Sequence, residues 1–190
     1  MNRTQKFALG SFLFNLAYGL YHVVSGMITQ SFWFFTIGVY YVILSAVRFV
    51  ALKHKGKKRF ILRFAGTMLM LLTLPLVGTV ILATVKDRGV VFHMIVMIAI
   101  ATYTFTKITI ATVNWIKTRK NGSAKLTALR SISFADAVVS VFALQRSMLV
   151  SFEGMTETEI CIMNVATGTA VTLAVFLLGL NLLKKGRKKY

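Results

Sequence analysis

Two oppositely charged residues, Lys107 and Asp136, each lie in the middle of a long apolar stretch. A charge at the centre of a membrane span costs about 2.5–3.5 kcal/mol on insertion scales, so it usually has a partner or a function. Lys107 precedes Lys117 by ten residues, and Asp136 follows Leu126 by ten. A helix rises about 1.5 Å per residue, so Lys107 lies roughly 15 Å before the end of its stretch and Asp136 roughly 15 Å after the start of the next. One connection joins these two ends, so the two residues lie at the same depth. We therefore expect Lys107 and Asp136 to form a buried ion pair.

Two interpretations of this pair remain open. In the structural one, the pair fixes the register of two helices, and each charge neutralises the other. In the functional one, Asp136 takes up protons or cations during transport, and Lys107 tunes it. A carboxylate beside an ammonium group stays ionised, which favours an ion-pair lock over a proton relay.

A second group of polar side chains lies within the apolar stretches and could line a small cavity. Asn15 and His22 are seven residues apart, so they share one helix face, with Tyr18 between them. The same side chains would also serve as interhelical hydrogen bonds, worth about 0.6 kcal/mol each. The candidates for the cavity are Asn15, Tyr18, His22, Tyr103, Gln145 and Asn164.

No residue group indicates an enzyme or a metal site. The three histidines, His22, His54 and His93, fall on different segments. The single cysteine, Cys161, excludes an intramolecular disulfide and a metal site built from cysteines. Paired carboxylates and a Ser/His arrangement at matching depth are absent from the sequence pattern. We expect no catalytic residue, no cofactor and no metal.

Six apolar stretches position these residues, and each has the roughly 20 residues needed to cross a bilayer. The chain is 56% hydrophobic and only 15% charged, whereas about a quarter of a soluble domain is charged. The first stretch is too long for the apolar region of a signal peptide, so it is expected to be a retained helix. The sequence predicts an all-α polytopic membrane protein with one integral membrane domain over residues 1–190. The expected spans are 7–29, 31–52, 60–85, 90–116, 126–152 and 159–183.

Lys and Arg alternate strongly between successive connections. The second and fourth connections and the C-terminal tail are rich in base, and the N-terminus carries Arg3 and Lys6. The first and fifth connections have none, and the third has only Lys86 and Arg88. Because cytoplasmic loops carry the excess of Lys and Arg, both termini are expected in the cytoplasm. The expected location is a bacterial plasma membrane.

The basic ends of the spans also predict partners. Each Lys or Arg near a membrane surface attracts anionic lipid by about 1 kcal/mol, so the cytoplasmic face is expected to contact anionic headgroups. The formal net charge of +18 would suit a nucleic acid. The charges gather at the ends of apolar segments and not on an amphipathic face, which argues against a nucleic-acid partner.

Two features predict how the helices pack. Pro75 lies in the middle of the third span, where it removes one backbone hydrogen bond and should kink the helix. Ala166, Ala170 and Ala174 form a small-residue stripe in the sixth span, a pattern that lets helices approach closely. Short connections predict three sequential antiparallel hairpins.

In size, span number and basicity, the chain resembles the substrate-binding subunits of energy-coupling-factor vitamin transporters. Those six-helix proteins capture a vitamin from outside and dock on a shared energising module through an Ala-x-x-x-Ala motif in the first helix. Here the first span has Ala8 and Ala17 without that spacing, and the alanine stripe lies in the sixth span. The resemblance is therefore one of architecture.

A shorter similarity involves Ser133, Phe134, Ala135 and Asp136, with Arg130 upstream. This segment is similar to the Arg…Phe-Ser-Asp motif of bacterial and lysosomal six-helix potassium channels. In that family the motif opens the first helix, whereas here it lies in the fifth span with Ala in place of Ser. We treat the similarity as coincidental.

Three classes of function are compatible with these patterns. The leading hypothesis is a solute-binding or transport component that works with partner membrane subunits or as a homo-oligomer. The second is a non-transporting structural or regulatory membrane protein that binds partner membrane helices or anionic lipid. An intramembrane enzyme is the least supported, because the one acid inside the spans already has an expected cationic partner.

Overall fold

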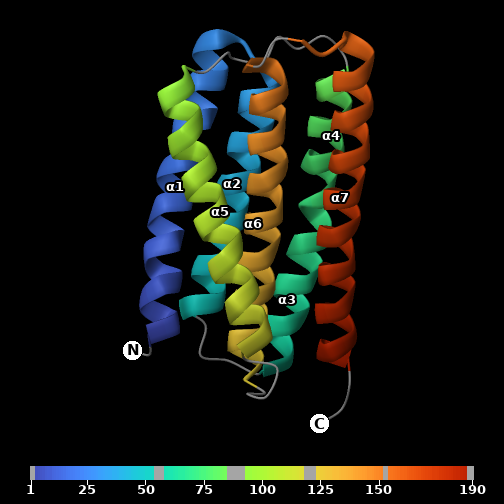
Figure 1. The fold of residues 1–190 in the computed structure, drawn as a ribbon. Helices are drawn as coiled ribbons and strands as arrows, with labels where there is room; N and C mark the ends of the chain where they lie inside the picture. Colours follow the sequence, from blue (N-terminus) through green and yellow to red (C-terminus); the bar gives the residue numbers. More distant parts are fainter. Residues whose placement is uncertain (1–2, 54–57, 85–92, 118–122, 152–153, 188–190) are drawn as a thin grey trace.

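The computed structural model describes residues 3–53, 58–84, 93–117, 123–151 and 154–187. Within these ranges the secondary structure is entirely α-helical (Figure 1). The helices are α1 (Arg3–Thr29), α2 (Phe32–Lys53), α3 (Lys58–Leu71), α4 (Thr73–Thr84), α5 (Met94–Lys117), α6 (Ala124–Ser151) and α7 (Glu157–Arg187).

Together α3 and α4 form one span, so the described helices provide six segments long and apolar enough to cross a membrane. The prediction of six helices long and apolar enough to span a membrane is confirmed, with ends close to those expected. The basic runs at 54–57, 118–122 and 188–190 and most of the third connection lie outside the described residues. The direction in which the spans cross a membrane is therefore treated below as a proposal.

The third span is interrupted at Leu72, three residues before Pro75. A proline at this position cannot donate a hydrogen bond to the carbonyl of Leu71, which lies one turn earlier. The hydroxyl of Thr73 donates to the carbonyl of Met70 at 2.6 Å and so satisfies a nearby backbone oxygen. The interruption thus falls where the sequence predicted a kink.

Spans that follow one another in the chain run antiparallel, and α1 begins at the same end of the bundle at which α7 ends (Figure 1). Helix α1 packs along α2, and α5 packs along α6. The third span departs from the expected three sequential hairpins, because α3 and α4 pack against α7 and not mainly against α5. The prediction was therefore wrong for the pairing of the third and fourth spans.

Glycines explain why the third span prefers α7. A Cβ atom on Gly179 would lie 2.9 Å from the carbonyl oxygen of Gly66, so only glycines allow this approach of α3 and α7. The predicted alanine stripe does not form this seam: Ala166 and Ala170 are exposed and Ala174 is half-buried. The stripe prediction is wrong within this chain, because the glycine face of α7 permits a closer contact than an alanine face.

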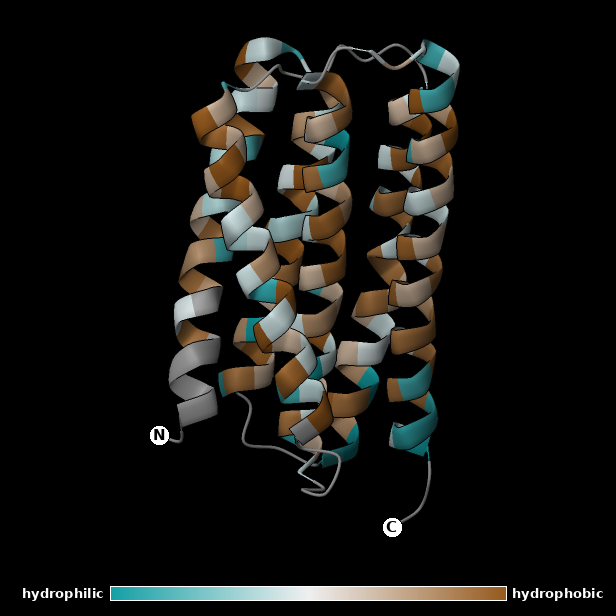
Figure 2. Cartoon of the chain, viewed as in Figure 1, coloured by the Kyte–Doolittle hydropathy of each residue, from teal (hydrophilic) through white to brown (hydrophobic). Residues whose placement is uncertain are grey.

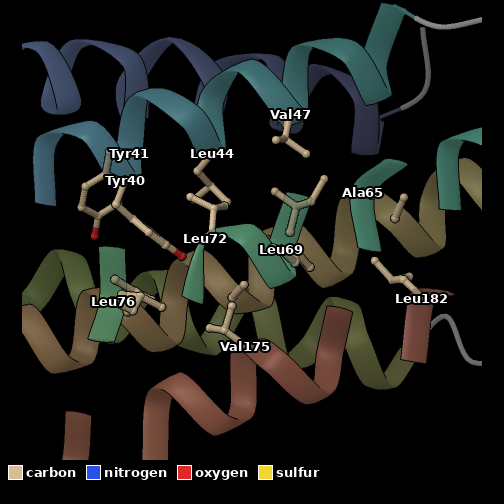
Figure 3. Close-up of a cluster of buried hydrophobic side chains, with 14 of the residues drawn as sticks. Tyr40, Tyr41, Leu44, Val47, Ala65, Leu69, Leu72, Leu76, Val175 and Leu182 are labelled. Atoms are coloured by element: carbon tan, nitrogen blue, oxygen red, sulfur yellow. The ribbon is translucent and has the colours of Figure 1, made fainter. Parts of the chain in front are cut away.

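The hydrophobic core lies between α2, the third span, α6 and α7 (Figure 3). On α2, Tyr40, Leu44, Val47 and Ala51 form one buried stripe at helical spacing. They meet the third span through side chains such as Leu69, which is fully buried. Helix α2 is consequently a central helix of the bundle.

The outer helices present large apolar side chains away from this core. Ile28 on α1, Ile95 on α5 and Leu177 on α7 are 77%, 71% and 61% exposed. Apolar colour continues along the outer sides of the helices, while polar colour gathers at their ends (Figure 2). Large apolar side chains exposed on several helices form the kind of surface that lipid would cover.

Candidate functional site

Four helices meet at the carboxylate of Asp136 on α6. The Nζ atom of Lys107 on α5 donates a hydrogen bond to Oδ1 at 2.6 Å. Asn15 on α1 donates through Nδ2 to Oδ2 at 2.6 Å. Arg48 on α2 donates through Nη2 to the same Oδ2 at 3.2 Å. The structure therefore brings Lys107 and Asp136 together and adds two further donors.

Ser140, one turn after Asp136, extends this network. Its Oγ accepts a hydrogen bond from Lys107 Nζ at 2.8 Å and donates one to the backbone oxygen of Asp136 at 2.8 Å. Because its single proton is used there, the Tyr41 hydroxyl at 3.1 Å must be the donor to Ser140. The Lys107 ammonium also lies 5.4 Å and 5.5 Å from the ring centroids of Tyr41 and Tyr103, within the range of cation–π attraction.

The network holds two positive charges and one negative charge. The side chains of Arg48 and Asp136 are each 1% exposed, and that of Lys107 is 12% exposed. A guanidinium stays protonated in proteins, so with Lys107 in its ammonium form the three side chains together carry one net positive charge. The other four acids of the sequence lie in connections or at the start of α7: Asp87, Glu153, Glu157 and Glu159.

Arg48 is the site residue that the sequence argument missed. Arg48 lies near the end of α2, from where a long side chain could reach the membrane surface, but its side chain points inward to Asp136. A signal was present, because Arg48 lies seven residues after Tyr41 and three after Ser45, on one helix face. That face of α2 is buried, so Arg48 is buried with it.

A cavity of about 540 Å³ opens above this network, between α1, α2, α5 and α6. Small-molecule sites typically have volumes of about 300–1,000 Å³. The cavity extends from Lys107 toward Thr29 and Trp33, near the turn that joins α1 to α2. It thus occupies the half of the bundle away from the start of α1. Eight of its twenty lining residues are aromatic: Phe14, Tyr18, Tyr21, His22, Trp33, Phe34, Tyr41 and Tyr103.

Four of the six predicted cavity residues line this space: Asn15, Tyr18, His22 and Tyr103. Gln145 and Asn164 do not belong to its lining, and this part of the prediction is wrong. Gln145 donates through Nε2 to the carbonyl of Met163 on α7 at 3.3 Å. The face of α6 that meets the cavity carries Ser140, Ala143, Leu144 and Ser147, and Gln145 points away from it.

The hydrogen bond of His22 fixes its tautomer in the neutral ring. Nδ1 lies 3.0 Å from the carbonyl oxygen of Tyr18, and a carbonyl only accepts, so Nδ1 carries the proton. Nε2 of the neutral ring is then a hydrogen-bond acceptor. The ring packs on Tyr18 with a centroid distance of 4.1 Å. His22 thus provides an acceptor group in the wall of the cavity.

Within the described residues, His, Cys, Asp and Glu side chains form no group of three that could hold a metal ion. No family model, curated protein or solved structure matches the chain. The class is therefore defined from the chain itself: an all-α bundle with six helices of membrane-spanning length and a charged cavity between four of them.

Proposed function

We propose that the chain is a solute-binding or transport component of a membrane and does not chemically convert its solute. The observation that supports this proposal most is the cavity of about 540 Å³ with the Lys107 ammonium at its base. Pockets that are mostly apolar, with a few convergent polar groups, are the usual form of small-molecule sites. A buried cation within a span is also a common mark of a solute pathway.

We further propose that both termini face the cytoplasm of a bacterial cell. The support is the distribution of base: Lys58, Arg59, Lys125, Lys184 and Lys185 belong to helix ends on the side where α1 begins (Figures 1 and 2). An excess of Lys and Arg marks the cytoplasmic side of a membrane protein. In this orientation, the cavity lies in the outer half of the bundle, suited to capture from outside.

The proposed partners are the bilayer, anionic headgroups at the basic end and another membrane subunit or a second copy of the chain. The attraction between the Lys and Arg side chains and anionic lipid supports the headgroups as partners. The exposed apolar sides of α1, α5 and α7 leave room for lipid or another membrane helix. Transport would require such a partner or a change in conformation that opens the cavity to the other side.

Ligand-dependent unfolding of the full chain in detergent tests the proposal. The panel spans sugars, amino acids, nucleobases and aromatic acids, each with a charge-matched relative. A solute at 100 times its Kd should stabilise the folded chain by about 2.7 kcal/mol and raise the Tm. Filling the cavity with Ala143→Phe should abolish the shift, whereas Ala170→Phe on the exposed side of α7 should not. Absence of any stabilising solute would contradict the proposal.

The alternative is a structural or regulatory protein in which the Asp136 network locks four helices. It is favoured by one observation: Asp136 accepts hydrogen bonds from side chains on three other helices. This alternative predicts that Ala143→Phe leaves stability and partner binding unchanged, with no solute response in either form.

A further inference from the structure

We propose that the cavity binds an aromatic carboxylate and that Lys107 pairs with its anionic group. This inference rests on the proposed solute-binding function and names the class of its solute. Three independent features support it: the charge of the network, the remaining donor of Lys107 and the nature of the cavity wall.

The charge of the network favours an anion. Arg48, Lys107 and Asp136 together carry one net positive charge when Lys107 is an ammonium, and no further acid within the spans can offset it. An uncompensated charge in a low-dielectric interior is unfavourable. An anionic solute beside Lys107 would bring the site to net zero charge and relieve that cost. A cationic solute would increase it.

Lys107 also retains the means to bind that anion. An ammonium group has three donors, and two of them go to Asp136 Oδ1 and Ser140 Oγ. Lys107 lines the cavity, while the carboxylate of Asp136 does not. The accessible charge at the base of the cavity is therefore positive, and one donor remains for a carboxylate oxygen of the solute.

The wall above Lys107 favours a flat, aromatic body. Tyr103 and Phe14 have a centroid distance of 4.8 Å, and Tyr18 meets Tyr41 edge to face at 5.0 Å. Aromatic rings pack well in offset or edge-to-face arrangements at such separations. His22 lies two turns beyond Asn15, about 10 Å along α1. A solute of that length could place a hydroxyl or amide donor on the Nε2 acceptor of His22.

Binding to the purified full chain in a neutral detergent tests this assignment. The probes are aromatic carboxylates from cinnamate to 2-naphthoate, each paired with its primary amide, which has nearly the same shape and no charge. The carboxylates should bind about 10- to 100-fold more tightly than their amides, the range expected from a charged hydrogen bond. Equal binding of acids and amides overturns the inference and leaves the solute-binding function intact.

Substitutions at Lys107 test the residue assignment. Lys107→Gln leaves Arg48 paired with Asp136, so the preference for the carboxylate should disappear. Lys107→Arg keeps the charge and should keep the preference. Lys184→Gln removes an exposed lysine at the end of α7 and should change neither the affinity for the carboxylate nor the affinity for its amide. If Lys107→Gln still binds the carboxylate more tightly than its amide, the assignment of Lys107 is overturned. If this variant does not fold, the comparison of carboxylates with amides in the wild type still tests whether the cavity prefers an anion.

Oleate supplies a carboxylate from a lipid source and completes the test. Tighter binding of oleate than of every aromatic carboxylate overturns the aromatic part of the inference. If another solute of the wider panel stabilises the chain and no aromatic carboxylate binds, the inference of an aromatic carboxylate is wrong and the proposed solute-binding function stands. If no solute of any kind stabilises the chain, the proposed function fails with it.

Discussion

Arg48 and Lys107 share the carboxylate of Asp136. This sharing separates the roles of the two cations. Arg48 is 1% exposed and does not line the cavity, so its charge serves the fold. Lys107 lines the cavity and keeps a donor, so its charge is available to a ligand.

Substitutions in the network should therefore have unequal effects on stability. Asp136→Asn leaves two buried cations without a counter-charge, and loss of one partner of a buried pair costs about 3–5 kcal/mol. Lys107→Gln leaves one cation and one anion in contact, so it should lower the free energy of unfolding clearly less than Asp136→Asn does. Thermal unfolding of the two purified variants beside the wild type measures the difference. Equal destabilisation would show that both cations are needed to hold Asp136.

At the scale of the helices, α1 and α2 form the cavity wall through a glycine-mediated contact. A Cβ on Gly38 would lie 2.6 Å from the backbone nitrogen of Val23, and one on Gly26 would lie 2.5 Å from that of Phe35. Both distances are too short for an unchanged backbone. The spacing of α1 from α2 therefore depends on these two glycines.

Gly38→Ala should force α1 away from α2, destabilise the chain by about 1–3 kcal/mol and weaken ligand binding. Gly10→Ala is the matched control, because a Cβ there meets nothing within 4 Å. That control should be neutral or gain about 0.5–1 kcal/mol, since alanine is the better helix former. Melting curves of both variants test this, and a neutral Gly38→Ala would contradict the close contact.

The sequence predicted how far along its helix a residue lies better than which neighbouring helix its side chain faces. Lys107 and Asp136 could be placed at one depth because the rise per residue is constant. Gln145 was misplaced and Arg48 was missed because the direction of a side chain depends on which helices are neighbours, and no single-helix pattern specifies that. The pairing of α3 with α7 depends on Gly66 and Gly179, whose importance emerges only when the two helices are in contact.

For the whole molecule, the orientation in the membrane has a direct test. In a Cys161→Ser background, Thr158→Cys at the start of α7 should react with a membrane-impermeant maleimide on intact cells. Lys184→Cys at the other end of α7 should react only after permeabilisation. Both positions are exposed in the structure, so access depends on the side of the membrane. The opposite labelling pattern would invert the proposed orientation and turn the cavity toward the cytoplasm.

The central claim is that the cavity between α1, α2, α5 and α6 receives an anionic aromatic solute. The chain has two tryptophans, and only Trp33 lines the cavity, whereas Trp115 packs on Phe134 with a centroid distance of 5.1 Å. The most direct measurement is a titration of Trp33 fluorescence with cinnamate in Trp115→Phe. The account predicts a saturable change that is absent in Trp33→Phe and about 10- to 100-fold weaker with cinnamamide. No saturable change, or the same change in Trp33→Phe, would contradict it.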